Sequence, residues 1–141
     1  MALGPTYLAD KSALARLKDP TVAARMEPLI ELGAIATCGM VELEVLWSTR
    51  GAADLRDVRR DWQGSFPRVP MSEVDFSRAA DVMGLLAQRH KHRSAKIPDL
   101  LIAAAAERAG LAILHYDRDF DLISQFTGQP AEWVVPAGSV D

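Results

Sequence analysis

Several features that define common protein classes are scarce in this 141-residue sequence. It has one cysteine, Cys38, so no disulfide can form within the chain and nothing demands an oxidising compartment. No stretch approaches the roughly 18–20 apolar residues of a membrane-spanning helix, and the first residues lack the basic and apolar regions of a signal peptide. We therefore expect a soluble cytoplasmic protein in which Cys38 is a small core residue.

Signatures of several enzyme classes are also missing. The sequence has no phosphate-binding glycine loop of the Walker or dinucleotide type, and no serine in a nucleophile-elbow sequence. Its three histidines lack zinc-ligand spacing, and one cysteine cannot complete such a site. The formal net charge of −3 gives the chain no general attraction for nucleic acid, so such binding would need a local basic patch.

Short apolar segments alternate with helix-like segments along the chain. Its length predicts one domain, residues 1–141, and its content of 49% hydrophobic and 25% charged residues is that of a globular protein. The pattern predicts strands at residues 6–9, 34–37, 69–71, 112–115 and 133–135, and helices at residues 11–17, 21–32, 39–48, 52–62, 73–90, 98–108 and 120–126. This alternation predicts an α/β domain with a mainly parallel central sheet flanked by helices.

Four carboxylates lie inside or directly beside segments whose apolar character predicts burial. They are Asp10, Glu44, Asp99 and Asp117. Two of them, Asp10 and Asp117, follow predicted strands, and sites in parallel sheets lie beyond the carboxyl ends of the strands. No basic residue is a near neighbour within these apolar segments. If the four acids converge, a cation must offset their repulsion, and a divalent metal bound by oxygen ligands is the simplest candidate.

Most of the 19 acidic residues are expected to be solvated, among them Asp54, Asp57, Asp61, Glu73, Asp75 and Asp81. On the helix predicted at residues 39–48, Glu42 and Glu44 are about 200° apart. The apolar residues of that helix, including Leu43 and Trp47, span an arc centred near Glu44. Glu44 is therefore expected to point inward and Glu42 outward, although pairing of Glu44 with a buried arginine stays open.

Three polar residues allow two interpretations each. Asp99 could simply interact favourably with the dipole of its helix, or it could belong to a metal site. The helix that it opens is apolar on every side, which favours the metal site. Asp119 could cap the helix predicted from residue 120 or support the ligands. Ser12 could orient Asp10 or bind a water on the metal, or it could be an ordinary first-turn residue.

Four motifs and the end of the chain carry a resemblance to a known family. They are residues 7–13 (YLADKSA), 41–45 (VELEV), 96–104 (KIPDLLIAA) and 114–120 (LHYDRDF), followed by residues 130–134 (PAEWV) and 136–139 (PAGS). The sequence resembles the PIN-domain ribonucleases and, among them, the VapC toxins of bacterial toxin–antitoxin pairs. The resemblance covers essentially the whole chain, although Lys11 stands where many relatives have threonine.

The resemblance implies a metal-dependent endoribonuclease that acts as a toxin. The family's acidic quartet carries over to Asp10, Glu44, Asp99 and Asp117, with Asp119 as a frequent fifth member. These acids would bind one or two Mg²⁺ or Mn²⁺ ions, which prefer oxygen ligands. The resemblance also implies an RNA substrate, a VapB-type antitoxin and a homodimer.

A basic segment without acids lies just before Asp99. Its charged residues are Arg89, Lys91, Arg93 and Lys96. Because acids alone would repel RNA, we expect this segment to contact phosphates at the rim of the site, although it could also be a solvated helix end. The alternative function is a non-catalytic PIN-like module that binds RNA or another protein.

Overall fold

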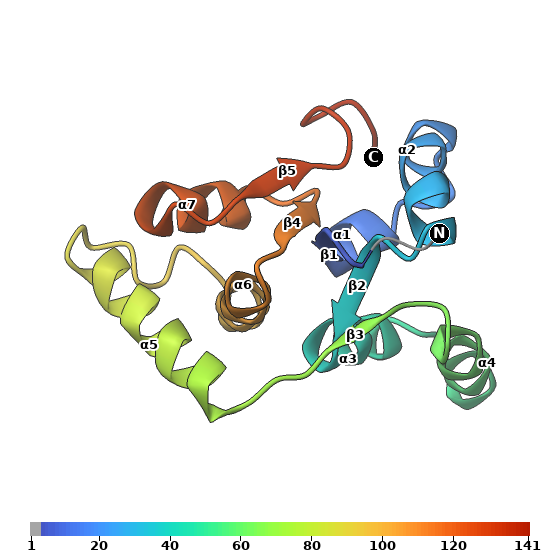
Figure 1. Cartoon of the computed structure of the whole chain (residues 1–141), viewed down its shortest axis with the longest axis horizontal. Helices are drawn as coiled ribbons and strands as arrows, with labels where there is room; N and C mark the ends of the chain where they lie inside the picture. The colour runs from blue at the N-terminus through green and yellow to red at the C-terminus, as the bar shows by residue number, and fades with distance from the viewer. Residues whose placement is uncertain (1–3) are drawn as a thin grey trace.

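The structure is a computed structural model that describes residues 4–141 (Figure 1). Its strands are β1 (Tyr7–Ala9), β2 (Ile35–Cys38), β3 (Arg68–Val69), β4 (Ala112–His115) and β5 (Ala131–Trp133). Its helices are α1 (Lys11–Leu14), α2 (Pro20–Glu31), α3 (Gly39–Trp47), α4 (Ala52–Trp62), α5 (Glu73–Ala87), α6 (Ile97–Ala109) and α7 (Arg118–Thr127). The order of elements is the one that the sequence predicts.

The strands form a parallel sheet in the order β3-β2-β1-β4-β5. In the central strand, Tyr7 is paired with Ile35 of β2 on one side and with Ala112 of β4 on the other. The chain first builds the sheet from β1 toward β3, and later adds β4 and β5 on the opposite side of β1. The order therefore reverses between β1 and β4, which is where α/β proteins form their ligand crevices. The predicted parallel α/β fold is confirmed.

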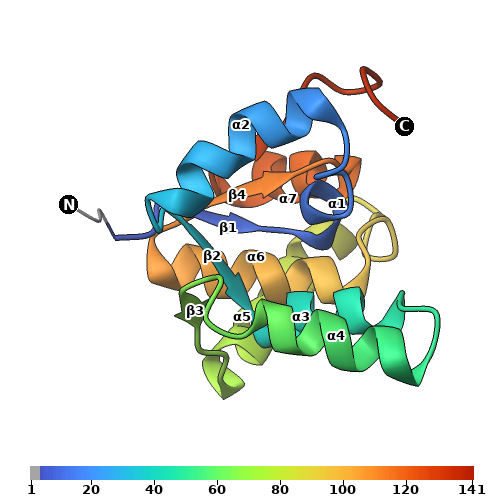
Figure 2. The ribbon, with the colours of Figure 1, turned by 90° about the vertical axis from the view of Figure 1, so that its right-hand side faces the viewer.

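Helices cover both faces of the sheet and enclose two apolar cores. Helices α1 and α2 lie on one face with the C-terminal segment, while α3, α5 and α6 lie on the other (Figure 2). The larger core contains Leu8, Leu100, Ile102 and Phe120, all at most 1% exposed. Helix α6 is buried along most of its length, as its apolar sequence predicts. Within residues 4–141, no helix combines the length and apolar character needed to span a membrane.

Some boundaries differ from the predicted ones for local reasons. Helix α2 begins at Pro20 because Asp19 caps it, accepting a hydrogen bond from the Thr21 backbone N–H at 2.8 Å. Helix α5 ends at Ala87, three residues before the predicted end, and His90 beyond it has a φ of 58°. The last strand lies two residues earlier than predicted, at residues 131–133.

Candidate active site

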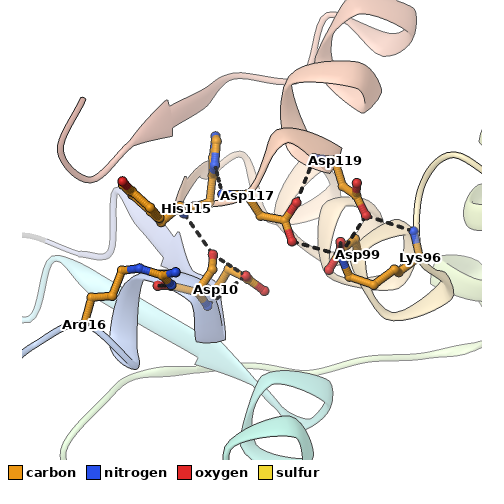
Figure 3. Close-up of polar contacts among 9 residues, drawn as sticks. Asp10, Arg16, Lys96, Asp99, His115, Asp117 and Asp119 are labelled. Atoms are coloured by element: carbon orange, nitrogen blue, oxygen red, sulfur yellow. Dashed lines mark hydrogen bonds and ion pairs between the residues drawn. The ribbon is translucent and has the colours of Figure 1, made fainter. Parts of the chain in front are cut away.

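Five carboxylates gather beyond the carboxyl ends of the strands and form two groups of three that share Asp99. The first trio is Asp10, Glu44 and Asp99, and the second trio is Asp99, Asp117 and Asp119. Within each trio, one oxygen atom from each carboxylate lies within 4.8 Å of the other two. Figure 3 shows the second trio around Lys96, with Asp10 beside it. The structure thus brings together the four acids that the sequence indicates, together with Asp119, the fifth acid that the resemblance implies.

Asp10 is held in the short connection between β1 and α1. Its Oδ2 accepts hydrogen bonds from the Ser12 backbone N–H at 3.0 Å and from the Ser12 hydroxyl at 2.6 Å. The same hydroxyl accepts the Tyr116 backbone N–H at 2.8 Å, which ties the end of β1 to the end of β4. The other oxygen of Asp10, Oδ1, is buried and has no hydrogen-bond partner. Ser12 therefore orients Asp10 and leaves one oxygen free.

The other two acids of the first trio are also short of partners. Oε1 of Glu44 and Oδ2 of Asp99 are buried and make no hydrogen bond, and the cation nearest to Asp99 is Lys96 Nζ at 3.4 Å. Burial, and after it a hydrogen bond with Asp119, raises the pKa of Asp99 to about 8. Burial, and after it the charge of Asp10, raises the pKa of Glu44. The described part of the protein therefore supplies too few hydrogen-bond donors for the buried oxygens of these carboxylates.

The second trio, in contrast, has a cation of its own. The Lys96 ammonium lies 2.9 Å from Asp117 Oδ2 and 3.0 Å from Asp119 Oδ2, and 3.4 Å from Asp99 Oδ2. Burial alone would lower the pKa of Lys96, but the hydrogen bonds to Asp117 and Asp119 outweigh it and raise this pKa. Lys96 stands three residues before Asp99, a spacing that places two side chains on the same face of a helix end. That spacing could have revealed the contact from the sequence.

Helix α7 begins directly after Asp117 and not after Asp119, which decides between the two interpretations of Asp119. Asp117 is the helix cap, accepting the Asp119 backbone N–H at 2.9 Å, so the cap interpretation of Asp119 is wrong. Asp119 instead accepts the Lys96 backbone N–H at 3.1 Å. Burial acts to raise the pKa of Asp119, but hydrogen bonds from Asp99 and Lys96 lower it.

His115 supports the position of Asp117, a contact that the sequence reasoning missed. Its Nδ1 accepts the Asp117 backbone N–H at 3.1 Å. The imidazole is fully buried, and burial lowers the pKa of His115, so the ring stays neutral and Nδ1 remains an acceptor. The sequence signal for this role is a histidine at the end of a predicted strand, two residues before a site acid.

Helix α3 confirms the orientation of Glu44 but not that of its neighbours. Leu43 and Trp47 are 62% and 86% exposed. The prediction that these two residues face inward with Glu44 is therefore wrong. Val41 is the fully buried residue of this helix, while Met40 and Val45 are partly buried against the larger core. Glu42 points away from the trios but is not solvated, since its side chain is 12% exposed and forms an ion pair with Arg68.

The basic segment divides into two parts. Arg89, Lys91 and Arg93 are exposed in the connector between α5 and α6. Arg89 and Lys91 line a hollow of about 630 Å³ together with Gln88, Gln125 and Phe126. Lys96, which the sequence grouped with them, instead reaches into the second trio.

The comparison with protein families decides where this fold belongs. The family model of the PIN domain matches residues 7–125, which is most of the chain and includes all five acids. The chain belongs to the PIN-domain family. The resemblance inferred from the sequence is thereby confirmed.

Named relatives of this PIN domain are VapC proteins. Ribonuclease VapC51 of Mycobacterium tuberculosis (strain ATCC 25618 / H37Rv) is 44% identical over 141 residues, covering 96% of this chain and 97% of that protein. Ribonuclease VapC21 of M. tuberculosis (strain CDC 1551 / Oshkosh) is 42% identical over 133 residues, covering 94% of this chain and 96% of that protein. The DNA-bound VapBC crystal structure from Salmonella typhimurium shares the fold, with a TM-score of 0.75 at 12% identity, over 93% of this chain and 99% of that one.

Proposed function

We propose that this PIN domain, residues 1–141, is the toxin of a toxin–antitoxin pair and a cytoplasmic endoribonuclease that depends on Mg²⁺ or Mn²⁺. One observation carries the proposal: Asp10, Glu44 and Asp99 form a trio in which each carboxylate has a buried oxygen without a hydrogen bond. Buried polar atoms in folded proteins are otherwise nearly always paired. The names of the relatives at 44% and 42% identity, both ribonucleases, support an RNA substrate.

The unpaired atoms of the first trio suit a hard divalent cation as ligands, because all of them are carboxylate oxygens. Asp10, Glu44 and Asp99 would hold the ion, and Asp117 and Asp119 extend the acidic surface beside it. A bound divalent ion would make a water molecule more acidic and would stabilise negative charge on an attacked phosphate. The protein contributes orientation, since Ser12 fixes one oxygen of Asp10 through two hydrogen bonds.

RNA has to approach this acidic site against electrostatic repulsion. Arg89, Lys91 and Arg93 lie in the connector that leads to Lys96 and Asp99, and they are exposed. We assign them to the phosphate-binding rim. Lys96 belongs to the same segment and could join them once its contacts with the second trio are released.

The partners of this domain follow from those of its structural neighbours. The similar folds include VapBC complexes, in which the toxin was solved with its antitoxin. We assign a VapB-type antitoxin as the partner of this chain. The resemblance to VapC toxins, and not these structures, is the basis for assigning a homodimer as its own assembly.

The decisive experiment compares cleavage and metal binding in the same variants. We expect the purified protein to cleave RNA with Mg²⁺ or Mn²⁺ and to stop in EDTA. Asp10→Asn and Asp99→Asn should each lower the rate about a hundredfold or more, because a metal in such a site supplies several kcal/mol. Mn²⁺ should raise the thermal unfolding temperature of the wild type, and this shift should be lost in Asp10→Asn.

The matched control is Asp81→Asn, which removes one exposed carboxylate from α5. It should retain both the cleavage rate and the Mn²⁺ shift. Full cleavage in EDTA would rule out the metal-dependent mechanism. An Mn²⁺ shift without RNA cleavage would instead favour a non-catalytic module.

The rim assignment predicts a change in salt dependence. Arg89→Ala combined with Lys91→Ala should weaken RNA binding and reduce the slope of log K against log salt by roughly 0.7 for each lost contact to a single strand. Arg56→Ala with Arg59→Ala, two exposed arginines of α4, is the control of equal charge. If the rim variant changes the sedimentation of the protein and leaves the salt slope unchanged, the segment serves assembly and not RNA.

A further inference from the structure

The two trios share Asp99 but differ in how their charge is balanced. In the first trio, Asp10 Oδ1 and Glu44 Oε1 are buried and lack any partner. In the second trio, the Lys96 ammonium lies within 3.4 Å of an oxygen from every member. One trio is therefore open to a cation from solution, while the other already holds a positive charge from the chain.

The contacts of Lys96 are those of a built-in counter-ion. Its ammonium bonds Asp117 Oδ2 at 2.9 Å and Asp119 Oδ2 at 3.0 Å, and its backbone N–H donates to the same oxygen of Asp119 at 3.1 Å. The backbone bond fixes the base of the side chain beside the trio. A divalent ion bound to the same oxygens would have to displace the ammonium, because two cations cannot share them at such short range.

Much of the Lys96 side chain is exposed to solvent. The side chain is 59% exposed, whereas that of Asp99 is 3% exposed. The ammonium can therefore leave the trio toward solvent without disturbing the packed core. A lysine stem is flexible and its ammonium acts as a point charge, so Lys96 can exchange one anionic partner for another.

We propose that Lys96 takes the place of a second divalent ion in the second trio, so that without RNA this domain binds one divalent ion, at Asp10, Glu44 and Asp99. The inference rests on the proposed metal-dependent function. It makes Lys96 a positioning residue for Asp117 and Asp119. It also explains why five acids of one site need not bind two metals before substrate arrives.

The test counts Mn²⁺ ions on the RNA-free protein by electron paramagnetic resonance, with the free ion measured at equilibrium. The wild type should bind one Mn²⁺ in the concentration range where Lys96→Gln binds two. The second ion should bind Lys96→Gln about tenfold or more tightly than it binds the wild type, because one opposing charge is gone. Spin–spin broadening between two neighbouring Mn²⁺ ions should appear in Lys96→Gln only.

Two controls separate charge from side-chain loss. Lys96→Arg keeps the cation and should bind one ion, and Lys91→Gln removes the same charge from the exposed connector and should also bind one. Two ions on the wild type, or one on a folded Lys96→Gln, would overturn the role of Lys96 and leave the metal-dependent function standing. The wild-type count decides even if Lys96→Gln does not fold. No Mn²⁺ bound by any of these proteins would overturn both proposals.

Discussion

Asp75 and Asp99 each occupy the third position of a helix, and both are almost completely buried, at 1% and 2% exposure. Asp75 in α5 accepts the Ser72 backbone N–H at 2.9 Å and two hydrogen bonds from Arg108, at 2.8 and 3.0 Å. Asp99 in α6 makes no such cap, because the Lys96 backbone N–H at that helix start donates to Asp119. Two acids in the same helical position thus have opposite surroundings.

The pKa values of the two acids move in opposite directions. The hydrogen bonds from Arg108 outweigh burial and lower the pKa of Asp75, whereas burial raises the pKa of Asp99 to about 8. The ion pair of Asp75 joins the start of α5 to the end of α6, so its role is structural. Burial by itself does not mark a functional acid. A buried carboxylate oxygen without a hydrogen bond, such as Asp99 Oδ2, does, because it destabilises the fold and needs another reason to be there.

The largest effect on stability is expected at the well-paired acid. Asp75→Asn should lower the free energy of unfolding by about 2–4 kcal/mol, because it removes charge-assisted hydrogen bonds and the side-chain cap of α5. Urea unfolding at pH 7 measures this change. The control Asp81→Asn, on the exposed side of the same helix, should stay within about 0.5 kcal/mol of the wild type. Equal effects of the two substitutions would show that the pair with Arg108 contributes nothing.

A smaller effect of opposite sign is expected at Asp99 in the metal-free protein. Its folded pKa of about 8 lies above the ordinary value of 3.8, so the folded state binds the proton more tightly than the unfolded state. The corresponding stability is fully present below about pH 4 and is lost as the pH rises through 8. Asp99→Asn removes this loss and should raise the free energy of unfolding by about 1–2 kcal/mol at pH 8.5.

Urea unfolding in EDTA at pH 5 and pH 8.5 checks this prediction. The wild type should lose more stability than Asp99→Asn between the two pH values. Destabilisation of Asp99→Asn at pH 8.5, of the size expected for Asp75→Asn, would show that the contact with Lys96 is a structural ion pair. The difference between the two acids would then disappear.

The sequence predicts the fold and four of the site acids for a simple reason. Short apolar runs identify the strands, and the parallel order then places Asp10 and Asp117 at one edge of the sheet. Glu44 and Asp99 stand out because they interrupt apolar segments. In each of these cases the signal lies within a few residues of the acid.

The sequence failed where the deciding partner is distant or where packing decides exposure. Asp75 was expected to be solvated among polar neighbours, but its partner Arg108 lies 33 residues away. Trp47 was expected to face inward because it is apolar, yet it is 86% exposed, with the Lys11 ammonium 6.0 Å from its ring centroid. Neither outcome follows from local pattern, since both depend on how the helices are placed on the sheet.

The smallest expected effect concerns Ser12, which donates hydrogen bonds to the site acid Asp10, just as Ser72 and Arg108 donate hydrogen bonds to Asp75. Ser12→Ala removes hydrogen bonds to Asp10 and to the Tyr116 backbone, and should lower the free energy of unfolding by about 1 kcal/mol. Because Asp10 would then be less well oriented, Mn²⁺ should bind roughly tenfold more weakly, as measured by titration calorimetry. Ser77→Ala, at an exposed position of α5, should change neither quantity. If Ser12→Ala loses stability but keeps the Mn²⁺ affinity of the wild type, Ser12 only ties β1 to β4, and the partners of Asp10 do not determine what it binds.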